Sequence, residues 1–147
     1  MSKLICIDPG ASGAIVTYDD VCMDIQKMPE GMTAICQRLK ELSDKGFKQA
    51  VVERVGGYMP GNSGPAAATF ARHCGWLDAS MFAYGIALKA NPTPQQWMKS
   101  IGVPKMESKQ DRKKWIKEWV QKRMPVVPVP LYAADAVALM LIYKDQT

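Results

Sequence analysis

The sequence predicts an α/β domain built on a mixed five-stranded sheet with helices on both faces. The first supporting observation is a pair of apolar segments within residues 4–16, separated by a loop rich in Pro, Ser and Gly, which is typical of a hairpin. The second is the order of the segments after residue 30, where helical patterns alternate with short apolar runs. A three-stranded antiparallel meander followed by parallel strands accommodates both observations.

Five strands are predicted from apolar runs that end at turn residues. The first run, at 4–7, is apolar throughout, which is typical of a strand buried on both faces of a sheet. Asp19-Asp20 predicts a turn between the second and third strands. The predicted strands are 3–7, 13–18, 21–28, 49–53 and 86–89.

The helices are predicted from apolar residues at helical spacing and from capping residues. Thr93 followed by Pro94 predicts the start of a short helix. Gly75 is expected to interrupt the second helix, and Trp115, Ile116 and Trp119 are expected to form the buried stripe of a strongly basic helix. The predicted helices are 32–45, 66–84, 94–101, 109–123 and 131–143.

Length and composition predict a single domain, 1–147, that needs no disulfide. We expect the four cysteines to be buried free thiols in a reducing compartment, because their spacing fits neither a zinc site nor a disulfide framework. No apolar run is long enough for a membrane span, and the first residues do not resemble a signal peptide, so a cytoplasmic location is expected. The net charge of +5 favours a polyanionic partner.

Three carboxylates lie in apolar segments that do not require an acid: Asp8 and Glu53 at strand ends, and Asp135 in the last helix. An isolated buried carboxylate is costly unless it is paired or bound to a metal. If the fold brings the three together, a hard divalent cation such as Mg²⁺ or Mn²⁺ relieves their repulsion. This pattern suits metal-assisted hydrolysis of phosphodiesters.

Each acid also has a purely structural explanation, and the spacing alone does not choose between the two. Asp8 precedes Pro-Gly and could form a turn, Glu53 could pair with Arg54, and Asp135 could cap the last helix.

Five short segments resemble, in order, the motifs of the RuvC-like Holliday-junction resolvases of the RNase H-like (retroviral integrase) superfamily. Ile-Asp-Pro-Gly-Ala-Ser-Gly resembles the first-strand motif, Val-Val-Glu the second acidic motif and Ala-Ala-Asp-Ala the motif of the last helix. A proline–tryptophan segment and a loop leading into a basic helix complete the set. The matching segments are 7–13, 51–53, 91–99, 105–114 and 133–136.

The resemblance implies an RNase H-like fold and a homodimer that cuts branched DNA, such as a four-way junction, by two-metal hydrolysis. In that scheme Asp8 bridges two Mg²⁺ or Mn²⁺ ions, Glu53 holds one and Asp135 holds the other. The sequence departs from the family pattern at Tyr132, where a second acid or a histidine is usual. A phenol is a poor Mg²⁺ ligand at neutral pH, so the second ion could be held weakly; Asp111 is a distant substitute.

The basic segment from residue 105 to 123 is expected to bind DNA phosphates, although a solvated helix face would show the same charges. By the resemblance, Lys109 is also the catalytic lysine near the scissile phosphate. The loop after Glu53 must lie near the acids, and Tyr58 in this loop could stack on an unpaired base or simply pack over the sheet edge. The predicted DNA-binding residues are Tyr58, Lys105, Lys109, Arg112, Lys113 and Lys114.

Three alternatives remain at this stage. A nuclease for flaps or RNA–DNA hybrids would keep the same site, whereas a non-catalytic junction-binding protein would agree with the incomplete acidic set at Tyr132. An Asp-Pro-Gly hairpin also opens the phosphate loop of actin/hexokinase-type ATP-binding domains, but the chain is too short for their two-domain cleft.

Overall fold

The computed structural model describes residues 3–55 and 64–146. In chain order its elements are β1 (Leu4–Asp8), β2 (Ala14–Tyr18), β3 (Met23–Lys27), α1 (Gly31–Asp44), β4 (Gln49–Val52), α2 (Gly64–Ala83), β5 (Ala87–Ala90), α3 (Pro94–Ser100), α4 (Lys109–Arg123), the 3-10 turn η1 (Leu131–Ala133) and α5 (Ala134–Tyr143).

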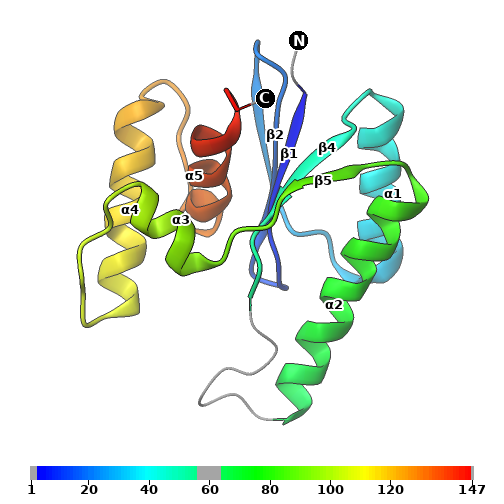
Figure 1. Ribbon diagram of the computed structural model, residues 1–147, viewed down its shortest axis with the longest axis horizontal. Coiled ribbons are helices and arrows are strands. Elements are labelled where there is room, and N and C mark those ends of the chain that lie inside the picture. The colour runs from blue at the N-terminus through cyan, green and yellow to red at the C-terminus, as the bar shows by residue number, and fades with distance from the viewer. Residues whose placement is uncertain (1–2, 56–63, 147) are drawn as a thin grey trace.

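The strands form one mixed sheet in the order β3-β2-β1-β4-β5. β1, β2 and β3 pair antiparallel, while β1–β4 and β4–β5 pair parallel. Helices α1 and α2 cover one face of the sheet, and α3, α4 and α5 cover the other (Figure 1). The predicted α/β architecture, with a meander followed by parallel strands, is confirmed.

The central strand β1 divides the core into two clusters because its side chains alternate between the faces of the sheet. Leu4 and Cys6 pack in the cluster that contains α5, whereas Ile5 and Ile7 pack against α1 and α2. All four side chains are at most 2 % exposed. The strand is therefore buried on both faces, as its continuous apolar run predicted.

Helix α5 lies against the centre of the sheet, on the face opposite α1 and α2 (Figure 1). Its small side chains allow the helix to approach the strands closely, and Ala134, Ala136 and Ala138 are all buried. Helix α4 packs on the outer side of α5 and contributes Ile116 and Val120 to the same cluster. Asp135 is thus carried by a helix that the core holds firmly in place.

The predicted boundaries differ from the observed ones mostly by one or two residues, and three differences have a structural cause or change an element. The third strand begins at Met23, because the Asp19 carboxylate accepts hydrogen bonds from the backbone N–H groups of Val21 and Cys22 and so extends the turn. Gly75 does not interrupt α2: it lies on the exposed side of the helix, where it has no packing role. The last helix is preceded by the separate 3-10 turn η1.

The cysteine prediction is only partly right. All four thiols are free, but only Cys6 is buried, while Cys22 is exposed and the other two are half-buried. On α4, Ile116 is buried as predicted, whereas Trp115 and Trp119 are half-buried at the margin of the core. In the described ranges no helix combines the length and the apolar character that crossing a bilayer requires.

Candidate active site

The three predicted acids line a single cavity of about 330 Å³ at the end of β1 and β4, which we call the acid cavity. The cavity also receives the turn after β1, the start of α3 and the first part of α4. Its lining residues are Asp8, Pro9, Gly10, Ala11, Ser12, Gly13, Glu53, Val55, Pro94, Met98, Lys109, Arg112, Lys113, Ile116 and Asp135.

Asp8 and Glu53 are neighbours because β1 and β4 are parallel and end together. Ile7 pairs with Val52, and the Glu53 N–H donates to the Ile7 carbonyl at 3.1 Å. By strand alternation Asp8 lies on the same face as Cys6, and Glu53 on the same face as Val51. Both acids therefore face α5, at the carboxyl edge of the parallel strands where ligand sites of open α/β sheets are found.

Asp135 approaches the other two acids from α5. It lies in the first turn of this helix, where the helix dipole favours a negative charge. The residues on either side, Ala134 and Ala136, are buried against the sheet, so the backbone that carries the carboxylate has little freedom. The structure thus brings together all three acids from opposite ends of the chain.

The turn after Asp8 has a shape that only glycine permits at two positions. Gly10 has a φ of +111°, and its carbonyl accepts a hydrogen bond of 3.0 Å from the Gly13 N–H. A Cβ on Gly13 would lie 1.9 Å from the Asp8 carbonyl oxygen. The Gly13 carbonyl in turn accepts a hydrogen bond from the Met28 N–H. Gly10 and Gly13 of the motif are therefore required by the backbone that follows Asp8.

Glu53 is held by the proline–tryptophan segment. The Trp97 indole Nε1–H donates to Glu53 Oε2 at 2.5 Å, and both side chains are buried, at 1 % and 7 % exposure. The same segment also fixes the adjoining backbone of β4: the Asn91 side chain donates to the Val52 carbonyl, and the Arg54 N–H donates to the Pro92 carbonyl. One carboxylate oxygen of Glu53 is therefore engaged by the indole, and the pairing with Arg54 considered above is not formed.

Burial and mutual repulsion disfavour the ionised forms of the three acids. Burial raises the pKa of Asp8 to about 8, and the negative charges of Asp135 and Glu53 add to this effect. Burial also raises the pKa of Glu53, although the Trp97 hydrogen bond opposes the shift. The pKa of Asp135 is raised by burial as well, against the attraction of nearby cations.

The cations belong to one face of α4, which forms the basic wall of the acid cavity: Lys109, Arg112 and Lys113. Lys113 is half-buried, and its charge lowers the pKa of each of the three acids. Lys109 is exposed and acts on Asp8 and Asp135. The wall therefore places three positive charges opposite three carboxylates.

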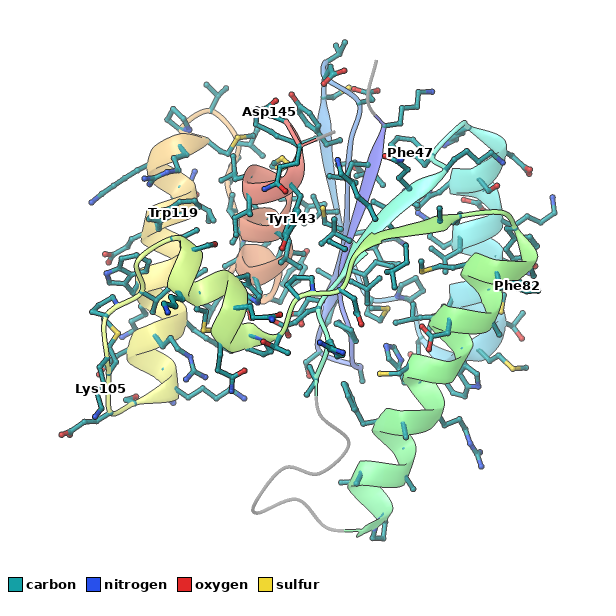
Figure 2. The ribbon with its side chains drawn as sticks, viewed as in Figure 1. Phe47, Phe82, Lys105, Trp119, Tyr143 and Asp145 are labelled. Atoms are coloured by element: carbon teal, nitrogen blue, oxygen red, sulfur yellow. The ribbon has the colours of Figure 1, made fainter. Side chains whose placement is uncertain are left out.

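The other predicted DNA-binding residues lie outside the acid cavity. Lys105 is exposed at the outer end of the loop between α3 and α4 and points away from the sheet (Figure 2). Lys114 lines a separate shallow depression together with Asp111, so neither residue reaches the three acids. Tyr58 lies outside the described residues. Tyr132, in η1, is 37 % exposed and is not part of the cavity lining.

The donor chemistry of the cavity fits a hard divalent cation, because three carboxylates that repel one another face a common space. Within residues 3–55 and 64–146, however, no three Asp, Glu, His or Cys side chains are grouped closely enough to coordinate one ion as they stand. A cation in the cavity would have to draw Asp8, Glu53 and Asp135 inward, and these are the residues that would hold it.

Comparison with known proteins gives matches at the level of structure. No family model matches the sequence, and no curated protein matches it. Thermus thermophilus RuvC, solved in complex with a Holliday junction substrate, superimposes with a TM-score of 0.70 over 98 % of this chain and 93 % of that chain, at 16 % identity. A second structure of Thermus thermophilus RuvC gives a TM-score of 0.58 over 97 % and 93 %, also at 16 % identity.

The sheet order and the helical layers give the chain an RNase H-like α/β fold. Within that class, it has the fold of RuvC over nearly its entire length.

Two residues near the site escaped the sequence analysis. Trp97 was recognised only as part of a motif, with no partner assigned, and His73 was assigned no role. His73 Nε2 accepts a hydrogen bond of 2.8 Å from the Gly10 N–H. No local sequence pattern predicts either contact, because the partner of Trp97 lies 44 residues away in the chain and the partner of His73 lies 63 residues away.

Proposed function

We propose that this protein is a metal-dependent endonuclease that cleaves branched DNA, with the four-way Holliday junction as its substrate. The observation that supports this most strongly is the acid cavity itself, in which three carboxylates on rigid elements face the basic wall of α4. The carboxylates suit a divalent cation and the wall suits a phosphodiester. The RuvC structure that contains a Holliday junction substrate extends over the same fold, which supports the choice of substrate.

Asp8, Glu53 and Asp135 would hold two Mg²⁺ or Mn²⁺ ions. Bound cations would supply Lewis acidity, lowering the pKa of the attacking water and neutralising charge on the phosphate. Trp97 keeps one oxygen of Glu53 engaged and so fixes the direction of the other. Asp8 is oriented by the turn between Gly10 and Gly13.

The basic wall binds and orients the substrate. Lys113 and Arg112 are half-buried beside the acids and would contact the phosphate next to the cleaved bond. Lys109, at the exposed end of the wall, is positioned to stabilise the charge that develops there. Lys105 and Lys114 would contact phosphates farther from the cleavage point. We also propose that the active form is a homodimer, since two cuts are needed to resolve a four-way junction.

The decisive experiment is cleavage of a synthetic four-way junction by the whole protein, in Mg²⁺ and in EDTA, with linear duplex, flap and RNA–DNA hybrid as competing substrates. We expect Mg²⁺-dependent cleavage of the junction in preference to the others. Preference for the flap or hybrid would keep the site and change the substrate. Tight junction binding with no cleavage in either Mg²⁺ or Mn²⁺ would identify a non-catalytic binding protein instead.

Asp8→Asn tests the assignment of the acids. The amide keeps the shape but removes a charged ligand, so we expect cleavage to fall about 1,000-fold, as loss of several kcal/mol of transition-state stabilisation implies. Junction affinity, measured by fluorescence anisotropy, should be unchanged or tighter. Asp78→Asn, an exposed change on α2, is the matched control. Retained cleavage by Asp8→Asn would refute the site, and sedimentation that shows only monomer on the junction would refute the dimer.

A further inference from the structure

The histidine of this chain, His73, lies on α2, in the helical layer that covers the opposite face of the sheet from the basic wall (Figure 1). It is 7 % exposed, between Phe70 and Trp76, whose rings lie 6.4 and 6.2 Å from the imidazole. Its Nε2 accepts the hydrogen bond from the Gly10 N–H at 2.8 Å. Since Nε2 accepts, the ring is neutral and its proton is on Nδ1.

Gly10 is the residue of the turn that α2 contacts. Its carbonyl accepts from Gly13, its N–H donates to His73, and its φ of +111° is open only to glycine. Phe70 also approaches it, since a Cβ on Gly10 would lie 3.5 Å from the Phe70 ring. The N–H and the carbonyl of Gly10 are both hydrogen-bonded, and the space beside its Cα is filled by Phe70. Two of these three contacts, those of His73 and Phe70, come from α2.

Asp8 lies two residues before Gly10 and ends a strand that is rigid up to that point. Asp8 pairs with Ala14 across the turn, so the direction of its carboxylate depends on the turn that joins them, and α2 contacts this turn through the His73 imidazole and the Phe70 ring. Misplacement of a catalytic group by about 1 Å costs on the order of 100-fold in rate. A hydrogen bond that holds the turn in register is thus able to control catalysis without touching substrate.

We propose that His73 is a positioning residue of the nuclease, which fixes the Gly10 turn through its Nε2 lone pair and thereby aims Asp8 into the acid cavity. The role rests on the proposed function for its catalytic consequence, but the hydrogen bond itself is a property of the fold. His73 acts through Gly10 and makes no contact of its own with the reacting atoms.

The test compares His73→Gln with His73→Met in the full chain. Glutamine and methionine have nearly the same length and flexibility, but only glutamine carries a carbonyl oxygen that can accept from the Gly10 N–H. We expect His73→Met to lower kcat for junction cleavage by about 100-fold, with KM and the junction Kd within about twofold of the starting protein. His73→Gln should restore kcat to within about fivefold.

A purely structural role would lower the melting temperature of both variants and affect them alike. Equal kcat for the two variants, whether high or low, would therefore overturn the proposal, provided that circular dichroism shows both folded. If either variant fails to fold, His73→Asn and His73→Leu provide a second matched pair that is judged in the same way.

Amide hydrogen exchange at Gly10 separates this proposal from the proposed function. The Gly10 amide should be protected in the starting protein and in His73→Gln, and should exchange at least tenfold faster in His73→Met. If the starting protein cleaves no branched DNA, the nuclease proposal fails while the exchange result still decides whether His73 holds the turn. If the protein cleaves but Gly10 exchange is the same in all three proteins, the positioning role is wrong.

Discussion

The two helical layers of this protein do different work, although both pack on the same sheet. The layer of α3, α4 and α5 carries Asp135, the basic wall and Trp97, and the acids of the sheet face it. The layer of α1 and α2 is joined to the sheet by an apolar cluster and contacts the turn after Asp8 through the His73 hydrogen bond and the Phe70 ring. The layer of α3, α4 and α5 therefore contributes the charged groups of the cavity, whereas the layer of α1 and α2 contributes packing and a backbone hydrogen bond.

The division follows from the alternation of side chains along β1. Cys6 and Asp8 point to one face while Ile5 and Ile7 point to the other, so an acid at an even position falls on the side of α5. A shift of one residue in this strand would turn Asp8 toward the apolar cluster of α1 and α2 and away from the basic wall. The comparison teaches that the register of one strand decides which layer becomes the active face.

Lys113→Met should show the largest contrast between the layers, with Lys40→Met on α1 as its counterpart of equal charge change. Loss of Lys113 removes the cation that acts on all three acids, so we expect cleavage to fall about 100-fold. The salt dependence of junction binding should also decrease by about one charge. Lys40 forms an exposed ion pair with Asp44, which contributes little, so cleavage should stay within twofold. Similar losses in both variants would show that the charge acts at long range and not within the cavity.

Trp97→Phe should have a smaller effect, because it removes only the indole N–H from Glu53. We expect about a tenfold loss of cleavage. The acidic limb of the pH–rate profile should also move to higher pH, because the hydrogen bond holds the pKa of Glu53 down. Trp119→Phe, half-buried on α4 beneath Arg123, is the control and should leave the profile unchanged. A limb that does not move in Trp97→Phe would mean that Glu53 does not titrate in the measured range.

The smallest expected effect is on stability in the absence of divalent cations. Asp8 has a higher pKa in the folded protein than in the unfolded chain, so the folded state retains a proton that the unfolded state has lost. The free energy of unfolding should therefore fall, by on the order of 1–3 kcal/mol, as the pH rises from about 4 to about 8. Urea unfolding at several pH values measures this slope. Asp8→Asn should flatten it and Asp78→Asn should not; a slope of opposite sign would contradict the burial of Asp8.

Much of this arrangement was predictable from local patterns. The apolar run at Ile5–Ile7 identified the central strand, and Thr93 and Pro94 identified the start of α3, whose capping box the structure confirms. The acids were conspicuous because each sits in an apolar segment, and the structure places all three in one cavity. The apolar run, the capping residues and the acids in apolar segments are all recognisable within a few neighbouring residues of the sequence, so no knowledge of the tertiary structure was needed to predict them.

The remainder depended on contacts between distant segments. The difference between half-buried Lys113 and exposed Lys114 depends on how α4 rolls against α5, and charge alone does not reveal that rotation. The effect of Tyr132 on the second metal ion stays a prediction, and Tyr132 is not among the residues that line the cavity. The partners of Trp97 and His73 are set by packing, which no single segment encodes.

The parallel pairing of β1 with β4 and the docking of α5 have a consequence for how activity arises during folding. Asp8, Glu53 and Asp135 meet only after contacts of very long sequence separation have formed, and such contacts form late and slowly. A partly folded or truncated molecule therefore holds at most a fragment of the site. For the nuclease proposed above, competence for cleavage would therefore arise only once the fold is complete.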